Sequence, residues 1–149
     1  MRYRLKTATW VVVREATAPP PRVLSNPAAV RDLARDLLRD ADDDREHFWL
    51  VLLNSQHHYL LSTLVSVGTL NASLVHPRQV FGPAVRYGAA ALILVHNHPS
   101  GDPTPSQEDV RLTRQLVECA KVFDIGILDH VVIGNGSEVC TSFADRGLL

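Results

Sequence analysis

Residues 90–109 predict a strand, a stiff loop and a helix in immediate succession, which favours an α/β fold. The run Ala90–Val95 is entirely apolar, as is typical of a strand covered on both faces. Pro99 cannot continue a central strand, and the sequence Pro103-Thr104-Pro105 leads stiffly into a helix that begins at Ser106. A covered strand followed by a helix belongs to a sheet with helices packed against it.

The other segments complete this α/β order. Apolar residues at helical spacing predict three helices, which are expected to start at Ser25-Asn26-Pro27 and to span Pro77–Tyr87 and Ser106–Phe123. β-branched and apolar runs predict a set of strands within the same region, namely Glu46–Leu53, His58–Val67, Ala90–Val95, Ile127–Ile133 and Glu138–Ser142. The first two of these strands are expected to form a hairpin. The predicted fold is therefore α/β, a mixed β-sheet flanked by helices.

The domain organisation is predicted to be simple. Residues 1–24 are expected to hold an N-terminal strand over Tyr3–Val13 and a proline-rich segment around Pro19-Pro20-Pro21. Residues 25–149 are expected to form one domain, because the chain of 149 residues is long enough for one hydrophobic core.

Composition excludes some classes of function and is typical of an ordinary soluble globular protein, which is expected in the cytoplasm. The formal net charge is −1 and no Lys/Arg cluster is present, so direct nucleic-acid binding is not expected. No apolar run approaches the roughly 20 residues of a membrane helix, and Met1–Leu5 lacks the features of a signal peptide. Cys119 and Cys140 do not form a CxxC pair, which favours reduced thiols in the cytoplasm.

Two histidines follow the apolar strand with one residue between them. In an extended chain, His96 and His98 lie on the same face, about 6.6 Å apart along the strand. Imidazoles at this spacing can lean together onto one zinc ion at Zn–N distances of about 2.0–2.1 Å. Two surface histidines in a strand-end loop are the alternative interpretation, and a lone His-x-His would favour it.

The start of the following helix adds a carboxylate to the histidines. Ser106-x-x-Asp109 is a capping-box pattern and could serve only to begin the helix. Asp109, however, shares the inner face of the helix with a stripe of mostly apolar residues, expected to be Thr113, Leu116, Val117 and Ala120. A carboxylate that points inward needs a charged partner or a metal ion. Ser106 lies on the same side, where it could cap the helix and still face a metal-bound water.

Glu46 is the remaining candidate for a residue of the site. It shares a strand face with Phe48, Leu50 and Leu52, and its alternative role is that of a carboxylate at the solvent edge. In the functional interpretation it is the general base, which takes a proton from zinc-bound water and passes it to the leaving amine.

At this point the residues match a known family. The pattern Glu46…His96-x-His98-x7-Ser106-x2-Asp109 resembles the JAMM motif of the JAB1/MPN metalloproteases. The stretches 68–78 and 96–101, together with Asp129-His130, are similar to the RadC branch of that family. The resemblance extends from about Ser25 to Leu149, so residues 25–149 are identified as a RadC-like JAB/MPN domain.

The resemblance implies an α/β fold related to the cytidine deaminases and a zinc ion held by His96, His98 and Asp109. It also implies that Glu46 is the base and that Ser106 helps to hold the tetrahedral oxyanion. The deaminase motifs themselves are absent, so peptide or isopeptide hydrolysis is the implied chemistry. Two departures from the family pattern are noted. The stretch before Ser25 is expected to be too short for the N-terminal helix-hairpin-helix region of longer RadC proteins, and Gln79 stands where the family usually has glutamate.

The resulting hypothesis is a zinc-dependent metallopeptidase or isopeptidase whose partner is a peptide or protein substrate. The alternatives are a metal-stabilised interaction module without catalysis and a DNA-repair accessory protein of the RadC type. A site of two histidines and one aspartate also accepts other divalent ions. His130 is expected to be a hydrogen-bonded core histidine rather than a fourth ligand. The sequence leaves the oligomeric state open and is compatible with a homo-oligomer.

Overall fold

The structure is a computed structural model that describes residues 22–24, 26–39, 41, 44–68, 75–137 and 139–149. The predicted strand Tyr3–Val13 and the proline-rich segment therefore lie outside the described residues, as do Ser25, Glu138 and the stretch 69–74 of the family resemblance. The predicted division at residue 24 stays a prediction.

One mixed sheet forms the centre of the described chain. Its strands follow the order β2-β1-β3-β4-β5. Their bounds are β1 His47–Leu53, β2 Tyr59–Val67, β3 Ala91–His98, β4 Gly126–Gly134 and β5 Cys140–Ser142. All neighbouring pairs are antiparallel except β3 and β4, which run parallel. The predicted hairpin is confirmed, since β1 and β2 are joined by a short turn and paired along their length.

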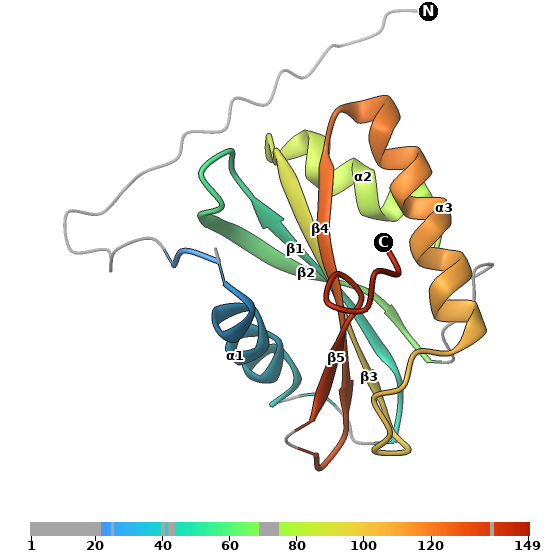
Figure 1. Cartoon of the computed structure of the whole chain (residues 1–149). Coiled ribbons are helices and arrows are strands. Elements are labelled where there is room, and N and C mark those ends of the chain that lie inside the picture. The colour runs from blue at the N-terminus through green and yellow to red at the C-terminus, as the bar shows by residue number, and fades with distance from the viewer. Residues whose placement is uncertain (1–21, 25, 40, 42–43, 69–74, 138) are drawn as a thin grey trace, which may run out of the picture.

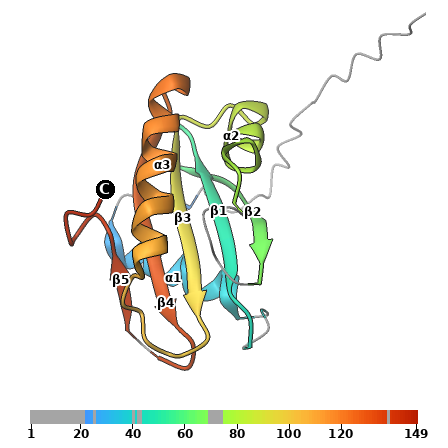
Figure 2. The same ribbon diagram turned by 90° about the vertical axis from the view of Figure 1, so that its right-hand side faces the viewer.

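Helices cover both faces of this sheet. Helix α1 (Pro27–Leu38) packs on one face, while α2 (Pro77–Arg86) and α3 (Gln107–Phe123) pack on the other, an arrangement visible in Figures 1 and 2. Alternation along β1 fits these layers, because Phe48 and Leu50 face α2 and α3 whereas Val51 faces α1. The predicted α/β class with a mixed, helix-flanked sheet is confirmed.

Strand β3 is longer than the sequence predicted. The expected end at Val95 was wrong, because the strand continues to His98. The reason is its neighbour β4, which pairs with β3 in parallel register as far as His98↔Gly134. Pro99 then ends the strand. Both histidines are thus held inside a regular strand.

The order β3–α3–β4 is a parallel crossover unit. In Figure 2 the carboxyl end of β3 and the first turn of α3 lie together at the lower end of the sheet. Ligand sites of open α/β sheets form outside the carboxyl ends of the strands, so a binding site is expected at this end of the molecule.

No helix within the described ranges combines the length and the apolar character needed to cross a bilayer.

Candidate metal centre

Three side chains from two elements converge at the carboxyl end of β3. The Nε2 atoms of His96 and His98 are 3.0 Å apart. Each also lies 3.3 Å from a carboxylate oxygen of Asp109, His96 from Oδ1 and His98 from Oδ2. All the donor atoms of this group fall within 4.8 Å of one another. His96 and Asp109 are buried and His98 is partly exposed, so the group opens to solvent on one side.

The spacing of these atoms suits a small divalent cation. Ligand atoms held at about 2.0–2.1 Å around a tetrahedral ion lie about 3.3 Å from one another. The three observed separations are 3.0, 3.3 and 3.3 Å. Two imidazole nitrogens and a carboxylate are also ligand types that zinc and related ions accept. The cluster is therefore suitable for binding a metal ion, and its composition leaves the identity of the metal open.

A chain of hydrogen bonds fixes the tautomer of His96. The hydroxyl of Thr113 donates to the backbone carbonyl of Asp109 at 2.7 Å, so its oxygen must accept from Nδ1–H of His130 at 2.6 Å. Nε2 of His130 then accepts from Nδ1–H of His96 at 2.7 Å. The consequence is that His96 presents a bare Nε2 lone pair toward His98 and Asp109.

Burial supports the neutral form of His130 that this chain requires. Complete burial, followed by the proximity of His96, holds the pKa of His130 well below its ordinary value. His130 contacts His96 through a hydrogen bond and packs against Phe48 and Phe143. This position agrees with the expectation of a hydrogen-bonded core histidine beside the site.

His98 is oriented by the loop that follows β3. Its Nδ1–H donates to the backbone carbonyl of Asp102 at 2.8 Å, which leaves Nε2 directed at Asp109. Hydrogen bonding to Asp109 is the largest effect on the pKa of His98 and raises it, although burial acts in the opposite direction. Burial would raise the pKa of Asp109, but hydrogen bonds to His96 and His98 outweigh it and hold that pKa well below its usual range. Asp109 is accordingly an ionised carboxylate.

Ser106 and Asp109 form a reciprocal helix cap. The Oγ of Ser106 accepts from the backbone N–H of Asp109 at 3.1 Å, and the N–H of Ser106 donates to Oδ2 of Asp109 at 2.6 Å. The capping box and the inward carboxylate were alternative interpretations of the sequence, and the structure combines them. The hydrogen bonds described for Ser106 are those of the cap, so its catalytic role stays a prediction.

Glu46 immediately precedes β1 and is half-buried. Its backbone carbonyl accepts from the N–H of Gly68 at 2.8 Å. It does not belong to the three-residue donor cluster, yet its charge is one of the influences that raise the pKa of His98, after those of Asp109 and Asp102. Glu46 is therefore near the cluster, and its role as a base stays a prediction.

Sequence reasoning did not identify every residue that organises this centre. Thr113 was expected only as part of the inner helix face, and its spacing of four from Asp109 was the signal for its bond to the Asp109 carbonyl. The expected inner face also included Val117, which is only half-buried. Leu112 takes that place in the core, because the buried face turns toward α2 and the sheet.

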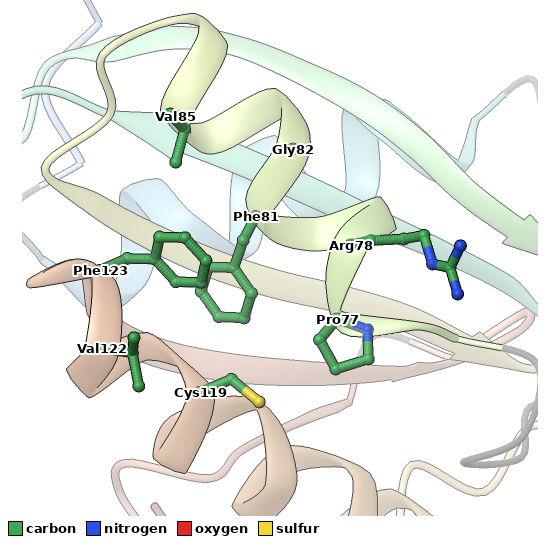
Figure 3. Close-up of a pocket in the computed structure, with 8 residues that line it drawn as sticks. All are labelled: Pro77, Arg78, Phe81, Gly82, Val85, Cys119, Val122 and Phe123. Atoms are coloured by element: carbon green, nitrogen blue, oxygen red, sulfur yellow. The ribbon is translucent and has the colours of Figure 1, made fainter.

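A separate apolar groove lies between α2 and the last turns of α3. Figure 3 shows the side chains that line it, which are Pro77, Arg78, Phe81, Gly82, Val85, Cys119, Val122 and Phe123. Its volume is about 530 Å³, and the rings of Phe81 and Phe123 stack with centroids 5.1 Å apart. Asp109 sits in the first turn of α3, about 15–21 Å along the helix from the groove residues Cys119 and Phe123 at 1.5 Å per residue. The groove and the three-residue donor cluster share no residue.

Comparison with known proteins identifies close sequence relatives. Residues 24–148 match the sequence profile described as "RadC-like JAB domain". A UPF0758 protein of Desulforamulus reducens is 47% identical over 127 residues, which are 85% of this chain and 54% of the relative. A UPF0758 protein of Moorella thermoacetica is 51% identical over the same shares of the two chains. One from Desulfitobacterium hafniense is 45% identical over 97% of this chain and 63% of the relative. The chain thus spans about half the length of the first curated relatives it matches.

Proposed function

The chain belongs to the RadC-like JAB domain family, and on that premise we propose that it is a zinc-dependent metallohydrolase that cleaves an amide bond. The proposed substrate class is a peptide or an isopeptide-linked protein, and the proposed location is the cytoplasm. The relatives are named only as UPF0758 proteins, a name that assigns no reaction, so the support comes from the site itself.

The observation that carries this proposal is the convergence of two bare Nε2 lone pairs on one ionised carboxylate. Lone pairs 3.0 Å apart repel each other unless a cation or a proton lies between them. The hydrogen bonds of His96 to His130 and of His98 to Asp102 direct both Nε2 atoms inward. Such support by outer hydrogen bonds is typical of metal-binding histidines. His96, His98 and Asp109 are the residues that would hold the ion.

A divalent metal ion bound here would polarise the amide carbonyl and lower the pKa of a water molecule beside it. The chain's own groups would perform the proton transfers. The carboxylate of Glu46 takes the proton of the attacking water and delivers it to the leaving nitrogen. The Oγ of Ser106 accepts from Asp109, and its own hydroxyl hydrogen is available to donate to the developing oxyanion.

The test combines metal content with cleavage of a peptide and isopeptide library. The purified 149-residue chain is expected to contain about one equivalent of divalent metal and to cleave members of the library. Glu46→Gln should keep the metal and lose turnover, whereas His98→Ala should lose both. A metal-loaded wild type that cleaves no library member, or a Glu46→Gln variant as fast as wild type, would overturn the assigned mechanism. The first of these results would favour a metal-stabilised interaction module.

A further inference from the structure

Asn97 lies between the two histidines on β3, but its side chain serves the opposite side of the strand. It is only 1% exposed, although an asparagine side chain carries two donors and a strong acceptor. Buried polar groups of this kind are costly unless their hydrogen bonds are satisfied. The partners of the Asn97 amide therefore indicate why this residue type stands between His96 and His98.

The amide bridges the backbone on either side of Glu46. Its Oδ1 accepts from the N–H of His47 at 2.6 Å, and its Nδ2 donates to the carbonyl of Arg45 at 2.9 Å. A third bond runs from Nδ2 to Oδ1 of Asn135 at 3.0 Å. Rotating the amide by half a turn would set oxygen against the Arg45 carbonyl and NH₂ against the His47 N–H. The orientation of the amide is thus fixed by its partners.

This bridge stands where regular strand pairing stops. The register between β1 and β3 ends at Phe48↔His96, so the backbone of Arg45, Glu46 and His47 lies beyond the ladder. The Asn97 side chain supplies two hydrogen bonds to that backbone in place of ladder bonds. On the other side, the N–H of Gly68 donates to the carbonyl of Glu46 at 2.8 Å. Glu46 is consequently held from both neighbouring strands.

We propose that Asn97 is a positioning residue that fixes Glu46 relative to His96, His98 and Asp109. The short segment 96–98 would then carry the two metal donors, His96 and His98, on one face and the residue that holds the Glu46 backbone, Asn97, on the other. Only the amide fits this task. Aspartate keeps an acceptor for His47 but sets a carboxylate against the Arg45 carbonyl, and serine is too short to span both partners. The catalytic consequence rests on the proposed function, whereas the positioning itself does not.

The positioning can be measured without any substrate. The isotope-labelled full chain is loaded with Co²⁺, and the pseudocontact shifts of backbone amides are recorded by NMR for wild type, Asn97→Ser and Asn97→Asp. Asn135→Ala is the matched control, because it removes the one bond of the Asn97 amide that does not flank Glu46. Both Asn97 variants should change the shift at Glu46, and Asn97→Ser, which loses the acceptor of the His47 N–H, should also speed hydrogen exchange at His47. The shift at Asp109 and both readouts in Asn135→Ala should stay as in wild type.

Metal affinity separates this role from one that acts on the ligands. Loss of a residue that orients a metal ligand lowers affinity about 10- to 100-fold, whereas the Asn97 variants should bind Zn²⁺ within about threefold of wild type. The inference is overturned if Glu46 keeps its wild-type shift in both variants. It is equally overturned if either variant loses metal as a ligand-orienting variant would, since Asn97 would then act on the histidines.

Turnover provides the second readout once a cleavable amide is found. Small misplacements of a catalytic group cost up to about 100-fold in rate, so kcat of Asn97→Ser should fall about 10- to 100-fold while KM stays within about twofold. A rise in KM alone, with kcat unchanged, would count against the inference. If the wild type cleaves nothing, the proposed function fails, and the shift of Glu46 still decides whether Asn97 positions it.

Discussion

Nδ1 of His96 and Nε2 of His130 lie 2.7 Å apart and share one hydrogen, which belongs to His96. This assignment follows from the Thr113 hydroxyl, which donates to the Asp109 carbonyl and leaves only its oxygen for His130. The helix that carries the carboxylate thereby also dictates which nitrogen of a strand histidine is bare. The donor set is coupled through its supports as well as through its converging atoms.

Removing this support should weaken metal binding without unfolding the protein. Thr113→Val deletes the hydroxyl at nearly constant volume and leaves Nδ1 of buried His130 unpaired. We expect Zn²⁺ affinity to fall about 10- to 100-fold, as for other second-layer partners of metal ligands. Competition with a chromophoric chelator measures it. Thr113→Ser, which keeps the hydroxyl, is the control and should bind like wild type. Equal losses of affinity in both variants would show that the hydrogen-bond chain from Thr113 through His130 to His96 does not support metal binding.

The two roles of Ser106 can be separated by two substitutions. Ser106→Ala removes the N-cap of α3 and should lower the free energy of unfolding by about 0.5–2 kcal/mol. Ser106→Gly should lower it by only a few tenths of a kcal/mol, because glycine is tolerated at the N-cap. Both variants lack the hydroxyl proposed to contact the oxyanion. Denaturant unfolding and kcat are to be measured together. If turnover follows stability, falling in Ser106→Ala but not in Ser106→Gly, then Ser106 serves only the cap.

Gly134 permits a close backbone crossing beside His98. A Cβ added at Gly134 would lie 2.0 Å from the carbonyl oxygen of Gly101, and this loop contains the Asp102 carbonyl that orients His98. Gly134→Ala should therefore destabilise the fold by about 1–3 kcal/mol, as overpacking does, and also weaken metal binding. Thermal unfolding and zinc titration test it. Gly82→Ala is the control, because its Cβ meets nothing within 4 Å and alanine favours a helix interior by about 0.5–1 kcal/mol.

The pKa directions predict how the metal-free chain responds to pH. The raised pKa of His98 stabilises the fold below its ordinary value of 6.5, and this stabilisation is lost as pH rises through the raised value. The lowered pKa of Asp109 stabilises the fold above its ordinary value of 3.8, and this is lost as pH falls toward the lowered value. Chelator-treated protein should thus lose thermal stability as pH rises above about 7. An apo Tm that climbs across this range would contradict the pairing, and His98→Gln should flatten the curve.

Periodicity was sufficient to predict the α/β order, since the apolar run of β3 and the helical spacing in α3 reflect local burial. It could not predict that β3 reaches His98, because that depends on register with β4, a strand distant in sequence. The donors of the centre were recognisable because histidine and aspartate are unusual beside apolar positions. The supports were not. Alternation along a strand turns Asn97 away from the two histidines, and only its hydrogen bonds to the Arg45 and His47 backbone show what its side chain does.

The donor group of His96, His98 and Asp109 links strand β3 to helix α3, which follows it in the chain. His96 and His98 lie at the end of β3 and Asp109 lies in the first turn of α3, so the loop 99–106 runs between the two parts of this donor group. An ion bound there would act as a clasp across this loop and add its binding free energy to that of folding. Chelation should then expose the stretch between Pro99 and Ser106 to proteolysis long before the hydrophobic core of the sheet opens.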